Sequence, residues 1–112
     1  MMSATEERID AILTAGARVA RAVDRVAELE DGRSLAKSDA IRRLMQTENG
    51  ETGKTHSASS AEKIVESDEE YAAYRRSQRE AEVEKHRAWA AYEAAKLTAQ
   101  LAVGLRVAGV EA

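Results

Sequence analysis

The chain of 112 residues contains no cysteine, no proline and no phenylalanine. Without cysteine it can form no disulfide, hold no thiolate-bound metal and use no cysteine nucleophile. Its uninterrupted apolar stretches are only a few residues long, so we expect no membrane-spanning segment and no membrane partner. Residues 1–7 are acidic and lack the apolar core of a secretory signal. These absences together favour a cytoplasmic protein of the bacterial type.

Alanine is the commonest residue, with 23 copies, and charged residues make up 33% of the chain. This composition is typical of long solvated helices. We therefore predict an all-α, elongated helical hairpin with coiled-coil-like packing, as a single domain over residues 1–112. The net charge of −3 argues against a duplex-DNA binder held by bulk positive charge.

The first helix is predicted over residues 4–30. Ser3 and Glu6 have the spacing of a capping box, which satisfies free backbone N–H groups at a helix start. Apolar residues then recur at alternating spacings of three and four, typical of a helix that packs lengthwise on another. This predicted stripe consists of Ile9, Ile12, Gly16, Val19, Val23, Val26 and Glu30. Gly32 predicts a stop, followed by a second helix over residues 34–46; if Gly32 only bends the chain, the two helices merge.

Residues 47–58 are polar, include two glycines and predict a loop. Residues 50–55 end like a phosphate-binding loop, but Glu48 occupies the place of the first required glycine, so we expect no nucleotide binding. A third helix is predicted over residues 59–108, with a capping box at Ser59 and Glu62. Such a helix would be about 75 Å long. Either it breaks, or the protein is elongated.

The third helix carries two apolar stripes on opposite sides. The first stripe consists of Tyr71, Tyr74, Ala81, Ala88, Tyr92, Ala95 and Ala99. The second consists of Val65, Ala72, Val83, Ala90, Ala94, Leu97, Leu101 and Leu105. One stripe can pack on the first helix, and the other needs a second cover. Self-association as a dimer or higher oligomer supplies that cover; the alternative is a closed three-helix bundle, with residues 34–46 folded over the stripe.

Trp89 is a large aromatic residue on a charged sector of this helix. Two readings are open: a twist of the bundle buries it, or it contacts another chain, as tryptophan anchors do in many interfaces. The predicted interface residues are Trp89, Tyr92, Leu97, Leu101 and Leu105. Basic and aromatic residues together can also bind single-stranded nucleic acid. The candidate contacts for that alternative are Arg75, Arg76, Arg79 and Arg87.

No catalytic, cofactor-binding or metal-binding residue is predicted, and we expect no enzyme activity. His56 lies in the predicted loop, and His86 lies inside a helix between two basic residues. Two isolated histidines do not make a metal site. The acidic residues at 66–70 complement the positive end of a helix dipole.

The stretch Thr52–Lys63, followed by Asp68-Glu69-Glu70-Tyr71 and by the Glu-Ala-Ala-Lys run at 93–96, resembles small phage and prophage proteins with a T-G-K-x-H-S-x-S-S-A-E loop and a long alanine-rich helix. Proline often fills the position of Thr55 in that family, so the chain departs from the pattern there. The resemblance covers residues 40–105 and implies a phage context without a mechanism. We therefore expect a non-enzymatic accessory protein that binds an unidentified protein, beside replication or recombination machinery. The alternatives are an inhibitor of a host defence system and a single-stranded nucleic-acid binder.

Overall fold

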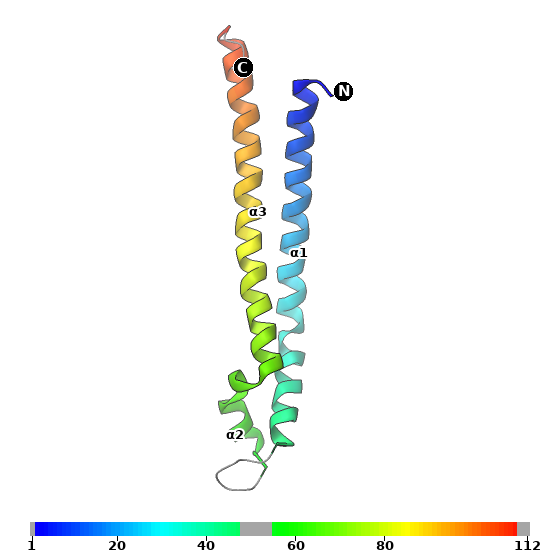
Figure 1. Cartoon of the computed structure of the whole chain (residues 1–112), viewed down its shortest axis with the longest axis vertical. Coiled ribbons are helices and arrows are strands. Elements are labelled where there is room, and N and C mark those ends of the chain that lie inside the picture. The colour runs from blue at the N-terminus through cyan, green and yellow to red at the C-terminus, as the bar shows by residue number, and fades with distance from the viewer. Residues whose placement is uncertain (1, 48–54, 110–112) are drawn as a thin grey trace. The chain divides into compact units, whose positions relative to one another are not determined.

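The computed structural model describes residues 2–47 and 55–109. Its elements are α1 (Ala4–Met45), α2 (Ala58–Lys63), the 3-10 turn η1 (Val65–Ser67) and α3 (Glu69–Val107) (Figure 1). These described ranges contain no strand, and the predicted all-α helical hairpin is confirmed.

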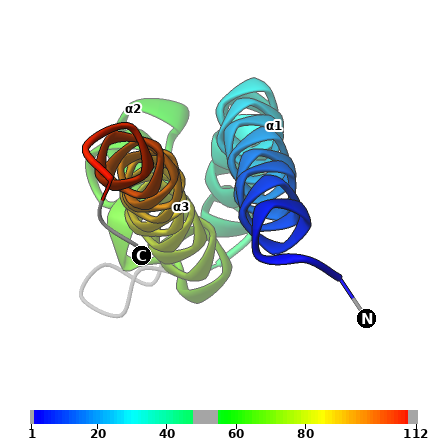
Figure 2. The same cartoon turned by 90° about the horizontal axis from the view of Figure 1, so that it is seen from above.

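The chain divides into two compact units. Unit 1 comprises residues 1–25 and 81–112, and unit 2 comprises residues 26–80. Each unit contains one segment of α1 and one segment of α3. Figure 2 shows the two segments of unit 1 side by side.

The contact between the helices of unit 1 is built largely from alanine. On α3, alanine recurs every seventh residue, at positions 81, 88, 95 and 102, and three of these four residues are buried. Ala88 packs with Val19 and Ala22 of α1, and Tyr92 covers this cluster. Small side chains at a helix contact allow the two axes to approach closely. The predicted tyrosine and alanine stripe of the third helix therefore faces α1.

The apolar stripe predicted for the first helix is rotated relative to the one that is buried. Val19 and Ala22 are buried, whereas Ile9 is 53% exposed and Val23 is 41% exposed. The alanine stripe of α3 lets the two helices pack closely. The small side chain of Ala22 therefore lies in the contact, where hydropathy alone predicts Val23. Hydropathy does not measure how closely two backbones must approach.

The predicted helix stop at Gly32 is wrong, and the alternative in which the two helices merge is correct. Helix α1 continues through this residue to Met45. A Cβ atom at Gly32 would lie 2.6 Å from the hydroxyl oxygen of Tyr74. That hydroxyl donates a hydrogen bond to the carbonyl oxygen of Leu29. The glycine makes room for a tyrosine of the facing helix and does not end α1.

The core of unit 2 brings together three elements. Ala40 of α1, Val65 of η1 and Tyr71 of α3 form a buried cluster, against which Ala36, Ile41 and Leu44 pack. Tyr71 is only 1% exposed. The neighbouring Tyr71 side chain raises the pKa of Arg33. Val65 reaches this core from η1, so the α-helix is interrupted between α2 and α3.

The predicted helix over residues 59–108 is therefore broken. Helix α2 ends at Lys63, and α3 starts at Glu69. The predicted capping box at Ser59 is wrong, because the hydroxyl of Ser57 accepts the hydrogen bond from the backbone N–H of Ser60. The cap predicted at Ser3 is confirmed by a bond of 3.2 Å from the backbone N–H of Glu6. The nucleotide motif at residues 50–55 lies mostly outside the described residues.

Candidate protein-interaction surface

The outer face of α3 in unit 1 exposes large aliphatic side chains. Leu97 is 56% exposed, Leu101 is 60% exposed and Leu105 is 41% exposed. Val83, on the same predicted stripe, is 47% exposed. Exposed single leucines are ordinary, but a row of them along one helix face is typical of an interaction site.

The alternative of a closed three-helix bundle is wrong for this stripe. The segment expected to cover it, residues 34–46, continues α1 as far as Met45 and belongs to unit 2. In the described part of unit 1, helical residues come from α1 and α3 alone. The leucines of the outer face are therefore left to solvent or to another molecule.

Two of the predicted interface residues, Trp89 and Tyr92, lie apart from the leucine row. Their rings meet edge to face, with centroids 5.9 Å apart. Tyr92 lies in the helix contact, where its ring is 3.6 Å from a Cβ atom built on Gly16, and Lys96 stands 4.7 Å above its centre. Trp89 is 43% exposed. Trp89 is therefore accessible to a partner, whereas Tyr92 packs between the two helices of unit 1.

The predicted nucleic-acid contacts are divided between the two units. Arg75, Arg76 and Arg79 belong to unit 2, and Arg87 belongs to unit 1. Arg75 donates a hydrogen bond of 2.6 Å to Gln78, while Arg76 and Arg79 are exposed. Nucleic-acid binding by these side chains stays a prediction.

An ion pair joins the two helices of unit 1 beside the alanine contact. Arg18 of α1 donates two hydrogen bonds, of 2.8 and 3.2 Å, to the carboxylate of Glu84 on α3. The pair raises the pKa of Arg18 and lowers the pKa of Glu84. Both side chains are more than one-third exposed, so solvent screens the attraction and the pair contributes little to stability.

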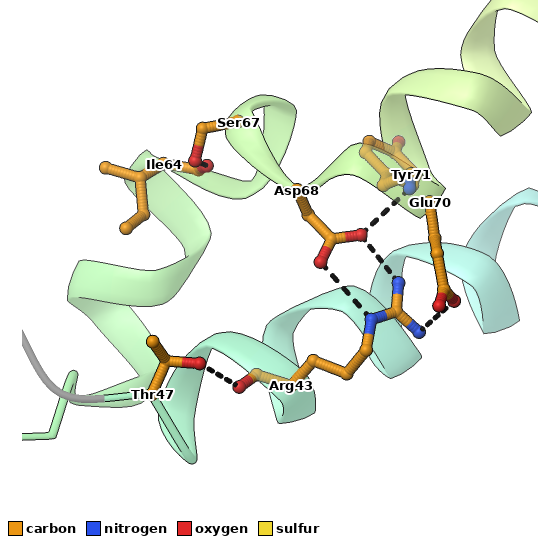
Figure 3. A network of polar contacts seen from close by, with 7 residues as sticks. All are labelled: Arg43, Thr47, Ile64, Ser67, Asp68, Glu70 and Tyr71. Atoms are coloured by element: carbon orange, nitrogen blue, oxygen red, sulfur yellow. Dashed lines mark hydrogen bonds and ion pairs between the residues drawn. The ribbon is translucent and has the colours of Figure 1, made fainter.

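A second and less exposed ionic network holds the start of α3 in unit 2, and sequence analysis did not identify it. Arg43 donates hydrogen bonds of 3.2 and 2.6 Å to Asp68 and forms an ion pair of 3.0 Å with Glu70 (Figure 3). The side chain of Asp68 is 11% exposed. Asp68 also accepts a hydrogen bond of 2.8 Å from the backbone N–H of Tyr71, so it caps the N-terminal end of α3. The Arg43 guanidinium, with this backbone bond, lowers the pKa of Asp68.

The two histidines do not converge on a reactive group. His56 Nδ1 lies 2.8 Å from the hydroxyl of Ser60, one turn further along the chain, and His86 is exposed on α3. Among the described residues, no group of three or more potential ligands could hold a metal ion. None of the described helices combines the length and the apolar character needed to span a bilayer.

Comparison of the chain with protein-family models, with curated proteins and with solved structures finds no match.

Proposed function

We propose that this chain is a non-enzymatic protein that acts through helix-mediated contacts with other proteins. The observation that carries the proposal is the exposed row of Leu97, Leu101 and Leu105 on α3. Full burial of an exposed leucine side chain is worth about 1.5–3 kcal/mol. These three side chains are 41–60% exposed, so a partner that covers them can gain roughly half of that energy from each one.

Trp89 supplies a second anchor for a protein partner. It is the only tryptophan of the chain, and it is 43% exposed although it contacts Tyr92. Tryptophan is enriched among the residues that dominate binding energy. Its edge-to-face contact orients the ring and so reduces the entropy that is lost when a partner binds.

The resemblance to small phage proteins gives the proposed setting. In that setting the partner is a component of the phage replication or recombination machinery. An inhibitor of a host defence system would use the same surfaces on a host effector. The two alternatives differ only in the protein that is bound.

Co-purification from phage-infected cells tests the proposal. The tagged wild type should retain one specific protein, and Leu97→Gln with Leu101→Gln, or Trp89→Ala, should release it. Leu13→Gln is the matched control, because Leu13 is 66% exposed on α1. A recombinase or single-strand-binding protein favours the first setting, and a nuclease or other host effector favours the second. Equal recovery of the same proteins by every variant would contradict the proposal.

A further inference from the structure

The outer face of α3 in unit 1 follows a second heptad pattern. Its positions recur at strict spacings of four and three between residues 83 and 108. They are Val83, Arg87, Ala90, Ala94, Leu97, Leu101 and Gly104, with Ala108 directly after the end of α3. All eight are exposed in the structure. This spacing is that of a coiled-coil contact, so the face suits a partner helix that lies lengthwise along α3.

The order of side-chain sizes along this face identifies the partner. If a second α3 lies antiparallel with Ala94 opposite Leu97, every layer joins a large side chain to a small one. Ala90 then faces Leu101, Arg87 faces Gly104, and Val83 faces Ala108. A two-fold axis repeats each of these pairs, which is the self-complementarity that a symmetric dimer requires.

We propose that two copies of this chain pair through α3, antiparallel and in this register, so that their unit 1 hairpins form a four-helix bundle. The inference rests on the proposed function, because it names a second copy as one partner of Leu97 and Leu101. When two helical hairpins associate as a four-helix bundle, the apolar stripe on the outer face of each hairpin becomes buried between them.

Gly104 supports the proposal independently. A glycine inside a helix costs about 1 kcal/mol relative to alanine. Gly16 and Gly32 of α1 each lie against a tyrosine ring, but a Cβ atom at Gly104 would meet nothing within 4 Å. The fold of one chain therefore gives no reason for this glycine. In the antiparallel register the long side chain of Arg87 from the second copy occupies the space above it.

A parallel pairing of the same faces is much less favourable. Each layer would then join identical residues, so Arg87 would face Arg87 and the two charges would repel. Ala90 and Ala94 would face their own copies and leave voids, which a packed interface does not tolerate. The antiparallel register removes both defects.

Sedimentation equilibrium of the full chain tests the pairing. The wild type should be a dimer at about 100 µM, and Leu97→Gln should weaken association by about 100-fold, because a symmetric dimer loses that leucine twice. Leu13→Gln should leave the association unchanged. Gly104→Leu should raise helix content and yet weaken the dimer, which separates loss of pairing from loss of folding. A monomeric wild type at that concentration overturns the proposal.

Cross-linking tests the register, since the chain has no cysteine of its own. A mixture of Ala90→Cys and Leu101→Cys chains should form a mixed disulfide, and neither variant alone should cross-link with itself. Self-cross-linking by each variant alone would show a parallel pair and overturn the register. If the wild type is monomeric but still retains a partner through Leu97 and Leu101, the dimer fails and the proposed function stands.

Discussion

At the scale of single residues, two glycines of α1 have opposite relations to the tyrosines that face them. Gly32 has no room for a Cβ atom, because the hydroxyl oxygen of Tyr74 would lie 2.6 Å away. At Gly16, the ring of Tyr92 would lie 3.6 Å from a Cβ atom, which is an ordinary contact. The same substitution should therefore have opposite effects at the two positions.

The first prediction is that Gly32→Ala destabilises the wild type but stabilises a Tyr74→Phe background. In the wild type the methyl group meets the Tyr74 hydroxyl, which is held by the carbonyl of Leu29. Without the hydroxyl, the higher helix propensity of alanine remains, worth up to about 1 kcal/mol. Urea unfolding of the four chains measures this reversal, and the same sign in both backgrounds would contradict it.

The second prediction is that Gly16→Ala stabilises the protein by up to about 1 kcal/mol. The new methyl group makes van der Waals contact with Tyr92 at 3.6 Å and meets no closer atom. It raises helix propensity in the middle of α1 without a compensating clash. Urea unfolding of this variant also serves as the control for Gly32→Ala, and a loss of stability here would show that the Tyr92 ring cannot accept the methyl group.

At the scale of elements, Asp68 joins the start of α3 to the end of α1. It accepts hydrogen bonds from Arg43 and from the backbone N–H of Tyr71 (Figure 3). The guanidinium and the backbone donor both stabilise the carboxylate, so the pKa of Asp68 lies below its usual value. A lowered carboxyl pKa in the folded state means that the unfolded chain binds the proton more readily.

The third prediction follows from the direction of that shift. The stabilisation by Asp68 is complete above the ordinary carboxyl pKa of about 4 and is lost as the pH falls through the lower folded value. Asp68→Asn should reduce stability at pH 7 and flatten its decline in acid. Thermal unfolding of both chains between about pH 7 and 2 measures the difference.

Glu84→Gln is the matched comparison for Asp68→Asn. The pKa of Glu84 is also lowered by an arginine, but the Glu84 side chain is 45% exposed, against 11% for Asp68. Solvent screens the exposed pair, so the acid response should change less in this variant. An equal or larger change for Glu84→Gln would contradict the role given to burial.

At the scale of the whole molecule, the two units differ in what they leave uncovered. Unit 2 buries Tyr71 and Val65 beneath three elements. Unit 1 buries alanine and valine between two helical segments and exposes the leucines of α3. Unit 1 therefore leaves leucine side chains that a second molecule could cover.

The fourth prediction is that the midpoint of thermal unfolding rises with protein concentration. Association of folded chains stabilises them by mass action, so a dimer resists heat more at higher concentration. Leu97→Gln should reduce this dependence, and Leu13→Gln should preserve it. A midpoint independent of concentration in the wild type would contradict pairing through α3.

The sequence alone determined the all-helical fold, the cap at Ser3 and the two apolar stripes of α3, and the structure decided which stripe faces α1. These features depend on local propensity and on period, which one helix expresses by itself. The outer stripe was also readable, because Leu97, Leu101 and Leu105 recur with helical spacing.

Only the tertiary structure decided the path of α1 through Gly32 and the break between α2 and α3. In the sequence, a glycine that ends a helix cannot be distinguished from a glycine that makes room for an aromatic ring. The position of the facing Tyr74 shows that Gly32 is of the second kind. Likewise, the ion pair of Asp68 becomes visible only in the folded chain, because its partner Arg43 is 25 residues away in the sequence. The physical reason is that steric fit and ion pairing depend on side chains from distant parts of the sequence. A local sequence pattern contains no information about those side chains.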